Sequence, residues 1–572
     1  MNVRYLVQIT DPETHIVKVR LSGKRDGLDK LSFFLPSWSP GSYLMREYAR
    51  NVRKIMATSE RGEPLYLIQR EKGVWDLEFD TLETKKEPIG FELEYEIYCH
   101  ELSVRTSHVD YSHAFLHGPS YLMGIKGEAL PNCEIEFEFT KVWSKLHTAL
   151  EDISTRREKF IYRAEDYDHL IDSPVEIGCH ESDGFHAHGK DHHLVFYGTE
   201  YPHDLNLKAD IKKVVEYVGE LFSSVPYKHY FFITHFCPNL YGGLEHHDST
   251  ALHFDGRILT DRKSYLNWLC LVSHEYFHTW NVKRIRPKAL GPFDYTSENY
   301  TRMHWLTEGL TSFIDEISVY NAGLMELNEY LEMQKDNLVR YFSIPGKRFH
   351  SLEDSSFNAW IKLYRPDENS NNSSVSYYLK GGLVFSTLHF ELKKQGKSIK
   401  DLLALLWDRY QSNQTTGLTK AEVMEMIESL AGVKVREQFD LRLSTTEDID
   451  FETYYKEIGC EFVWDETKVP WLGVDFKTEG DRVIVSSVVL DGPAYKAGLN
   501  AGDEILAVNR LRFLKGDIEK ISKLFNIGKN YNIQISRLNK VFEVTLQIGQ
   551  RPKLLKEIAV KNAKKAKAAF SL

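Results

Sequence analysis

The 572-residue chain lacks the features that mark several classes of protein. Its six cysteines are scattered without C-x-x-C spacing, which excludes a disulfide framework and a cysteine zinc site and is typical of a reducing compartment. No apolar run approaches the roughly 18 residues that span a bilayer, so we expect no membrane span. The first 20 residues contain no signal-peptide core. We expect a cytoplasmic protein, or a periplasmic or exported one if a leader precedes this sequence.

A basic excess is also missing. The 72 Lys and Arg residues face 82 Asp and Glu residues, and the net charge of −10 argues against nucleic-acid binding. Only the C-terminal segment 551–572 has a clear excess of basic residues, and we expect it to form a solvated tail. The segment His180–His193 holds five histidines, which predict a flexible solvated loop, with metal binding as the alternative.

What the chain does contain is the composition and length of several globular domains. It is 42% hydrophobic and 27% charged, and its length predicts three or four domains. The first 165 residues or so alternate apolar and polar positions, as half-buried strands do. A helix is expected at 209–222 and a strand at 230–234. Helical periods dominate from Ser264 to Leu441, including a helix capped by Thr419, and short strands return in Trp471–Gly549.

The strongest local signal is the segment His274-Glu275-Tyr276-Phe277-His278. It lies in the apolar stretch Tyr265–Trp280, which we expect to form a buried helix. Residues i and i+4 share one helical face, so both imidazoles can bind one ion, and Glu275 is placed to deprotonate a water on it. Zinc with three protein ligands keeps one position open and lowers the pKa of its water to about 7. The alternative is a helix whose histidines are only hydrogen-bonded.

Such a site needs a third ligand. Trp305–Asp315 reads as a second buried helix that carries acidic residues, and burying an unpaired charge is costly. If Glu308 were a zinc ligand, the ion would balance the charge of its buried carboxylate. Asp315, two turns further on, could accept a hydrogen bond from a ligand imidazole. An arginine partner for Glu308 is the alternative, and three other ligands remain open: His304, Glu298 and Asp294.

Two further segments carry candidate substrate-binding groups. In Tyr241-Gly242-Gly243-Leu244-Glu245 the paired glycines, Gly242 and Gly243, permit close backbone approach, and Glu245 beside them could bind an ammonium group. A simple turn is the alternative. Tyr377-Tyr378-Leu379-Lys380-Gly381-Gly382 opens another helix, where a phenol could donate to a developing oxyanion or simply pack.

These residues resemble the glycyl aminopeptidase family of zinc metallopeptidases, which is related to aminopeptidase N and leukotriene A4 hydrolase. The segments HEYFHTWNVKRIRP, PFDYTSENYT and WLTEGLTSF carry the resemblance. It extends upstream to LPSWSPGSYLMREYARNV (Leu35–Val52) and VRTSHVDYSHAFLHG. Downstream, Trp471–Phe476 and Gly492–Leu506 look like a bacterial-type PDZ module.

The resemblance implies a multidomain α+β fold. Its expected parts are an N-terminal β-sandwich-like domain at 1–168, a thermolysin-like zinc catalytic domain with a helical lobe at 169–460, a PDZ-like module at 465–550 and a basic tail at 551–572.

The resemblance also implies residue roles. His274, His278 and Glu308 match the ligands of one zinc ion per chain, and Glu275 matches the general base. Tyr378 rather than Tyr377 matches the oxyanion tyrosine. The motif Gly242-Gly243-Leu244-Glu245-His246 is similar to the exopeptidase motif Gly-Ala-Met-Glu-Asn of the relatives, so Glu245, with the two glycines, is expected to hold the α-amine of the substrate. In the PDZ-like module, the amides around Leu472, Gly473 and Val474 would receive a C-terminal carboxylate.

Two departures accompany the likeness. The 29 residues 279–307 separate His278 from Glu308, a longer insertion than in aminopeptidase N, and His246 stands where those relatives have Asn. The expected function is a zinc-dependent aminopeptidase that cleaves the first bond of peptides with a free N-terminus, favours Gly or Ala, and uses Glu275 to assist the attack of a zinc-bound water. The alternatives are a zinc endopeptidase with PDZ-presented substrates and an inactive PDZ scaffold that binds peptides.

Overall fold

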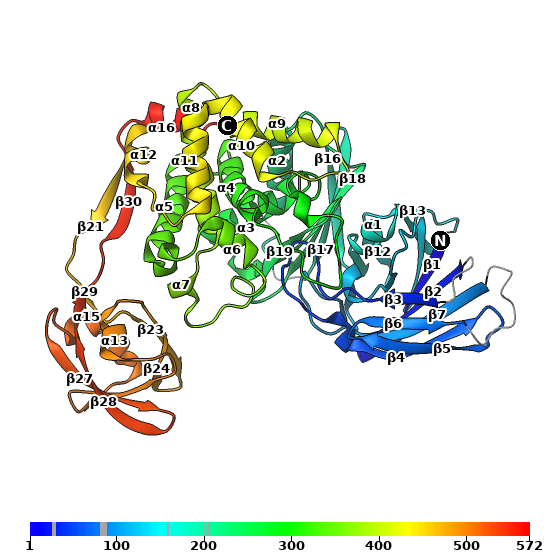
Figure 1. The fold of residues 1–572 in the computed structure, drawn as a ribbon, viewed down its shortest axis with the longest axis horizontal. Coiled ribbons are helices and arrows are strands. Elements are labelled where there is room, and N and C mark those ends of the chain that lie inside the picture. Colours follow the sequence, from blue (N-terminus) through cyan, green and yellow to red (C-terminus); the bar gives the residue numbers. More distant parts are fainter. Residues whose placement is uncertain (26–29, 80–88, 157–158, 199–200, 204) are drawn as a thin grey trace. The chain divides into compact units, whose positions relative to one another are not determined.

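The computed structural model describes residues 1–25, 30–79, 89–156, 159–198, 201–203 and 205–572 (Figure 1). This part of the chain forms two compact units. The first comprises Met1–Thr301, Ile314–Met325 and Lys400–Val423, and the second comprises Arg302–Phe313, Glu326–Ile399 and Met424–Leu572. Within these described residues, no helix combines the length and apolarity that crossing a membrane requires.

The first unit begins with a large mixed sheet, drawn in blue and cyan in Figure 1. The apolar positions of its first strand, Val3, Tyr5, Val7 and Ile9, are all at most 4% exposed, as the period of two predicts. Eleven strands pair within the described residues, in the order β10 (Gly124–Ile125), β3 (Lys30–Phe34), β6 (Val74–Glu78), β5 (Pro64–Glu71), β4 (Val52–Ser59), β7 (Ile89–Tyr98), β2 (Ile16–Arg25), β1 (Val3–Ile9), β11 (Cys133–Phe139), β14 (Phe160–Ala164) and β13 (Glu151–Asp152).

A smaller antiparallel sheet shares the buried core of the large one. Its order is β12 (Lys145–Thr148), β15 (Val175–Gly178), β9 (His113–Leu116) and β8 (His108–Val109). Because β15 pairs with both β12 and β9, these β-rich residues extend past position 168.

The sheet that carries Glu245 follows in the chain. Its order is β16 (Glu181–Ala187), β17 (Lys190–Tyr197), β18 (His229–Phe236), β20 (Ser249–Phe254) and β19 (Tyr241–Glu245). Strands β17, β18 and β20 are parallel, whereas β19 runs antiparallel to β20. The edge strand β19 therefore presents both glycines and Glu245.

The histidine-rich segment is a strand pair and not the flexible loop that its composition predicts. Strands β16 and β17 pair from Glu181–Phe196 to Ala187–Lys190, and β17 also pairs with β18. His192 is 1% exposed, and its Nε2 atom lies 2.7 Å from the Tyr227 hydroxyl. Pairing with a buried parallel strand overrides the polar composition, which carries no information about partners distant in sequence.

Helices make up most of the chain between this sheet and the C-terminal strands. In the first unit α2 (Leu207–Gly219) precedes α3 (Arg262–Phe277), whose N-cap Asp261 accepts from the Ser264 amide at 2.8 Å. The predicted helix at Trp305–Asp315 is in fact a π-helical turn, η6 (Trp305–Gly309), that continues into α4 (Leu310–Asn321). The remaining long helices are α5 (Leu327–Ser343), α8 (Tyr377–Lys394), α9 (Ile399–Ser412), α10 (Lys420–Ala431) and α11 (Val433–Ser444).

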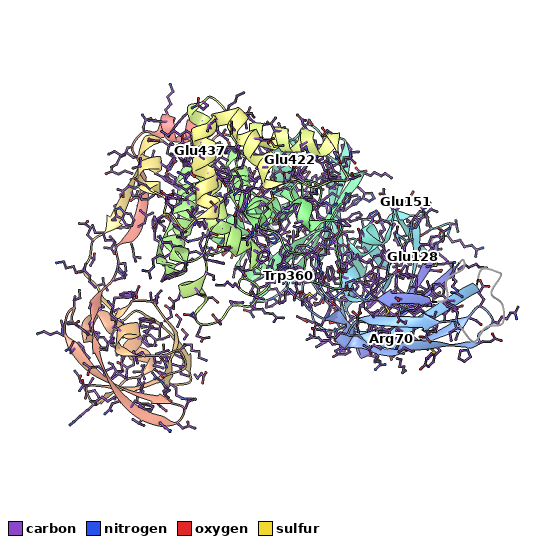
Figure 2. The ribbon with its side chains drawn as sticks, in the orientation of Figure 1. Arg70, Glu128, Glu151, Trp360, Glu422 and Glu437 are labelled. Atoms are coloured by element: carbon purple, nitrogen blue, oxygen red, sulfur yellow. The ribbon has the colours of Figure 1, made fainter. Side chains whose placement is uncertain are left out.

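The predicted cap of α10 is confirmed. The Glu422 amide donates to Thr419 Oγ1 at 3.3 Å, and the Thr419 amide donates to Glu422 Oε2 at 2.8 Å. Figure 2 labels Glu422 on this helix.

The C-terminal part of the second unit contains a small sheet with its own apolar core. Its order is β23 (Val474–Glu479), β24 (Arg482–Val488), β25 (Glu504–Val508), β27 (Asn530–Arg537) and β28 (Lys540–Gln547), with β26 (Leu511–Arg512) paired to β25 and the helix α13 at Pro493–Ala497.

Residues 551–572 are folded, so the prediction of a solvated tail from their charge is wrong. They form β30 (Leu554–Val560), which pairs with β21 (Cys460–Asp465), and α16 (Ala563–Ala569). Phe570 is 1% exposed, and His389 Nε2 lies 2.9 Å from the Ala569 carbonyl oxygen. A few apolar side chains anchor the segment while its lysines face solvent.

Candidate active site

The end of α3 presents two histidines on one helical face, as the i, i+4 spacing predicts. The ring centroids of His274 and His278 are 4.7 Å apart. His274 Nδ1 lies 2.8 Å from Asp315 Oδ2, and His278 Nδ1 lies 2.6 Å from the Asn281 carbonyl oxygen. Both oxygens are acceptors, so each Nδ1 carries the proton and each Nε2 carries the lone pair, which is the tautomer that a metal ligand needs.

Glu308, on the π-helical turn η6, supplies a carboxylate to these imidazoles. The donor atoms of His274, His278 and Glu308 all lie within 4.8 Å of one another. Two imidazole nitrogens and one carboxylate oxygen form the donor set of a catalytic zinc site, so the residues fit this ion. In the described part of the chain, none of the comparable clusters contains the alternative ligands His304, Glu298 and Asp294.

Two carboxylates lie beside the same histidine. Donor atoms of Glu245, Glu275 and His278 are within 4.8 Å of one another, and all three residues are at most 5% exposed. The Oε1 atom of Glu245 has no hydrogen-bond partner among the described residues. Two buried carboxylates so close together need positive charge nearby, because burial and mutual repulsion both disfavour ionisation.

Glycines make room for these carboxylates. A Cβ atom on Gly243 would lie 2.1 Å from Glu275 Oε1, and a Cβ atom on Gly41 would lie 2.5 Å from both carboxylate oxygens of Glu245. Gly41 also has a φ of +84°, which favours glycine. Any side chain at either position would displace an acidic group. The predicted backbone approach to the paired glycines of β19 stays a prediction. The role of Gly41 was not predicted.

The Gly243→Ala variant should lose about 100-fold in peptidase activity, because its Cβ atom pushes the Glu275 carboxylate out of position. Some loss of stability should accompany the loss of activity, since the buried Glu275 side chain must move and its Cγ atom lies only 2.5 Å from the added Cβ atom. Steady-state kinetics and urea unfolding measure the two effects. Gly516→Ala is the matched control, because open space surrounds Gly516. Full activity of Gly243→Ala would contradict the placement of Glu275.

Asp172 holds the chain just beyond β19, a contact that the sequence did not predict. Its Oδ1 atom accepts from Lys283 Nζ at 2.9 Å and from His246 Nδ1 at 3.0 Å, and its Oδ2 atom accepts from the His247 amide at 2.9 Å. Burial by itself raises the pKa of the Asp172 carboxyl, but the Lys283 ammonium and the His246 imidazole outweigh burial and hold this pKa well below its usual range. His246, the departure from the relatives' Asn, thus has a defined partner.

Replacing Asp172 with Asn should lower the free energy of unfolding by about 1–3 kcal/mol at pH 7, because Lys283 loses its counter-charge in a mostly buried site. The folded-state pKa of Asp172 is depressed, so the difference between wild type and variant should be full above the ordinary aspartate pKa of about 3.9 and shrink as the pH falls below it. Urea unfolding at several pH values measures this. Asp183→Asn, in the exposed pair with Lys208, should change stability by less than about 0.5 kcal/mol.

The start of α8 lies against the π-helical turn. A Cβ atom on Gly381 would lie 2.7 Å from the Gly309 Cα atom, so the two backbones touch only because both residues are glycine. Burial raises the pKa of the Tyr378 phenol well above its ordinary value, and the nearby Glu308 carboxylate adds to the rise. The Tyr364 hydroxyl lies 3.4 Å from that of Tyr378. Tyr377 is fully buried and stacks on His304.

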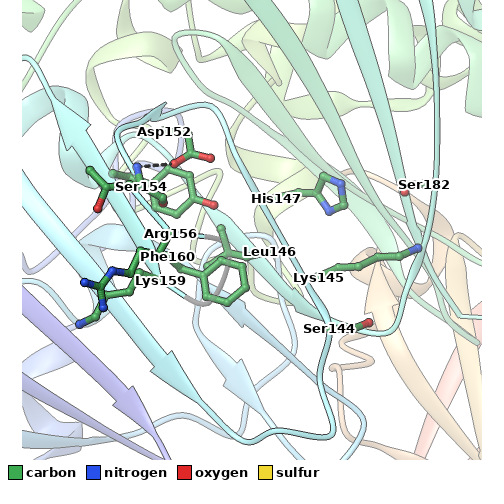
Figure 3. Close-up of a pocket in the computed structure, with 12 residues that line it drawn as sticks. Ser144, Lys145, Leu146, His147, Asp152, Ser154, Arg156, Lys159, Phe160 and Ser182 are labelled. Atoms are coloured by element: carbon green, nitrogen blue, oxygen red, sulfur yellow. Dashed lines mark hydrogen bonds between the residues drawn. The ribbon is translucent and has the colours of Figure 1, made fainter.

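Two cavities in the first unit differ in their relation to these residues. One of about 420 Å³ is lined by Gly41, Asp172 and Glu245, among others. The other, of about 610 Å³, is drawn in Figure 3, which shows Lys145, His147 and Ser182 around it. No predicted site residue lines this second cavity.

Family comparisons agree with this geometry. The M61 glycyl aminopeptidase model matches residues 267–384, and the model of the peptidase M61 N-terminal domain matches residues 4–179. The chain belongs to the M61 glycyl aminopeptidase family. A PDZ domain model matches residues 470–548 of this M61 chain. The predicted family, metallopeptidase class and PDZ module are therefore confirmed. No curated protein matches the chain in sequence.

Solved structures extend the comparison beyond this M61 family. An aminopeptidase N family protein from Idiomarina loihiensis is 28% identical, with a TM-score of 0.92 and coverage of 100% of both chains. An M1 zinc metallopeptidase variant from Deinococcus radiodurans, bound to a Tyr-Ser-Ala substrate, is 11% identical with a TM-score of 0.50, over 78% of this chain and 94% of that one. This second likeness concerns the fold alone. Native yeast LTA4 hydrolase is 14% identical with a TM-score of 0.47, and the match covers 79% of this chain and 67% of that one.

Proposed function

We propose that this M61 chain is a zinc-dependent aminopeptidase that removes the N-terminal residue of peptides with a free α-amine. The observation that carries the proposal is the buried group of Glu245, Glu275 and His278, whose donor atoms lie within 4.8 Å of one another. Because Glu245 and Glu275 lie so close together, a substrate whose α-ammonium group is held by Glu245 would bring its first peptide bond near Glu275. A longer N-terminal extension would meet the Glu245 carboxylate.

The metal site consists of His274, His278 and Glu308. Zinc bound there supplies a Lewis acid and lowers the pKa of a water molecule to about 7. Asp315 and the Asn281 carbonyl orient the two imidazoles through their Nδ1 atoms.

The protein groups divide the remaining chemistry. Glu275 takes a proton from the attacking water and returns it to the leaving amine. Tyr378 donates a hydrogen bond to the carbonyl oxygen as negative charge develops on it. Glu245, with Gly242 and Gly243 beside it, holds the α-ammonium group. The preference for Gly or Ala is supported by the description of the family as glycyl aminopeptidases.

The decisive experiment compares Gly-, Ala- and Leu-arylamides with their N-acetylated counterparts. We expect cleavage of the unblocked substrates, fastest for Gly and Ala, and much slower cleavage of the blocked ones. Chelation should abolish activity and added zinc should restore it. Equal rates on acetylated substrates would favour an endopeptidase, and metal-free, inactive protein would favour a peptide-binding scaffold.

The PDZ module supports a second proposal, capture of a C-terminal peptide. Strand β23 lies at the edge of its sheet and pairs only with β24 in the described chain, so its other edge can receive a peptide strand. The Leu472 carbonyl accepts from the Ala494 amide and the Gly473 carbonyl from the Val489 amide, both at 2.9 Å. Because trans peptide groups are planar, the amides of Gly473 and Val474 point the opposite way, where a carboxylate could bind.

The module also contacts the helical part of its own unit. The Asn372 side chain donates to the Val488 carbonyl at 2.7 Å and accepts from the Leu490 amide at 2.8 Å. These contacts involve the last residue of β24 and the connection that follows it, and not the edge of β23. We also propose a cytoplasmic location, since no disulfide links the six cysteines in the described structure. Of the four-part division we keep the boundary at 460 as a proposal; the first boundary lies beyond 168, because β15 pairs within the N-terminal β-rich region, and residues 551–572 pair with β21.

A further inference from the structure

A second cluster of metal-binding side chains lies in the N-terminal domain, at the turn between β8 and β9. The donor atoms of His108, Asp110 and His113 lie within 4.8 Å of one another. We propose that these three residues bind a divalent transition metal of the zinc class, at a site distinct from the H-E-x-x-H centre. The ion would be held by two imidazoles and one carboxylate, a donor set that suits zinc.

His113 is oriented as metal-ligating histidines are. Its Nδ1 atom lies 2.8 Å from Glu176 Oε1, and the carboxylate can only accept, so Nδ1 carries the proton and Nε2 the lone pair. The His113 residue is 1% exposed, yet Nε2 has no hydrogen-bond partner among the described residues. Leaving a buried acceptor unpaired is costly, and a bound cation would offset that cost.

Glu176 is itself fully fixed. Its second oxygen, Oε2, lies 2.9 Å from His235 Nε2, and its side chain is completely buried. The carboxylate therefore cannot turn toward another partner without breaking a second buried bond. A carboxylate that holds the Nδ1 proton of a ligand histidine is the usual outer support of a metal site.

His108 has the same tautomer for the same reason. Its Nδ1 atom lies 2.6 Å from the His100 carbonyl oxygen, so Nε2 again carries the lone pair. That atom lies 3.4 Å from Asp110 Oδ2. Two acceptors facing each other repel unless a cation lies between them, and two ligands of a tetrahedral zinc at about 2.0–2.1 Å are themselves about 3.3–3.4 Å apart.

Asp110 divides its oxygens between the turn and the proposed ion. Oδ1 accepts from the amides of Ser112, at 2.7 Å, and His113, at 3.2 Å, which fixes the turn. Oδ2 is the atom that faces His108. The side chain of Asp110 is 27% exposed, so an ion can enter from solvent on this side while His113 remains buried.

An exposed histidine–aspartate pair in the same unit provides the contrast. His186 Nδ1 lies 3.0 Å from Asp191 Oδ1, and both side chains are more than half exposed. This pair is an ordinary surface contact, since water can solvate both groups and the carboxylate that contacts the His186 ring is itself exposed. It is therefore a matched control for non-specific zinc binding by surface histidines.

The test measures zinc bound to the full-length protein after metal removal and dialysis against zinc. We expect two equivalents in the wild type, one in Asp110→Asn, one in His278→Gln and none in the double variant. Asn at position 110 keeps the acceptor oxygen of the turn and removes the charge. His186→Gln should keep both equivalents. Equal zinc content in the wild type and Asp110→Asn would overturn the proposal, as would zinc-free His278→Gln protein.

A thermal readout separates loss of the ligand from loss of the fold. In the His278→Gln background, where the other metal site is removed, added zinc should raise the melting temperature, because a ligand that binds only the folded state stabilises it. In the His278→Gln/Asp110→Asn variant zinc should no longer do so, while the metal-free melting temperatures of the two proteins should agree. In the same background, a zinc response that persists in the Asp110→Asn variant would contradict these ligands. A zinc response that persists in a His108→Gln variant would contradict them equally.

Discussion

Replacing Glu275 with glutamine should lower peptidase activity by about 1,000-fold or more while zinc content stays unchanged. Glutamine has the same shape and can still form hydrogen bonds, but it cannot take a proton, and general-base catalysis contributes about 10²–10⁴-fold. Glu275 is not one of the residues assigned to the metal, so the ion should remain bound. Steady-state kinetics on an unblocked Gly-arylamide, together with elemental analysis for zinc, measures the two quantities.

Glu298 provides the matched control for this change. It is an exposed glutamate and one of the alternative ligands that the sequence leaves open. Glu298→Gln should retain both activity and zinc. If it loses zinc, the assignment of Glu308 as the third ligand is wrong; if Glu275→Gln retains activity, another group acts as the base.

Replacing Glu245 with glutamine should lower kcat/KM for unblocked substrates by about 100-fold, because breaking a buried pair of charges costs roughly 2–5 kcal/mol and each 1.4 kcal/mol is tenfold. The loss should concern substrates with a free α-amine, so the ratio of the rates on unblocked and N-acetylated substrates should fall toward one. Parallel kinetics on the two substrate sets measures this ratio.

Stability must be measured alongside that ratio, because Glu245 lies on an edge strand near a network held by Asp172. The Asp172→Asn variant separates the two effects: it disturbs the chain after β19 without removing the carboxylate of Glu245. A ratio that is unchanged in Glu245→Gln would show that this carboxylate does not select the free amine.

Local sequence patterns predict the N-terminal strands and the helix that carries both histidines of the proposed zinc site. The period of two in β1 and the i, i+4 spacing in α3 are set by backbone geometry, so strand, helix and the shared face of His274 and His278 follow from the residues alone. Motif likeness adds the family and the PDZ module, because it reads several separated segments together. Composition does not predict structure where a partner distant in sequence determines it. The histidine-rich hairpin and the C-terminal β30–α16 segment have polar compositions typical of solvated segments. Both are nevertheless folded, because β17 pairs with β18 and β30 pairs with β21.

The sequence by itself determined that this protein has an H-E-x-x-H helix, a nearby acidic helix, a β-rich beginning and a PDZ-like module, since each depends on residues close together in the chain. Only the tertiary structure decided that the carboxylates of Glu245 and Glu275 lie close against Gly41 and Gly243. It also decided that Asp172 holds the chain after Glu245 and that Glu176 orients His113 in a second cluster. The physical reason is that these contacts join residues tens to hundreds of positions apart, and hydrogen bonds, ion pairs and steric limits act through distance in space and not along the sequence.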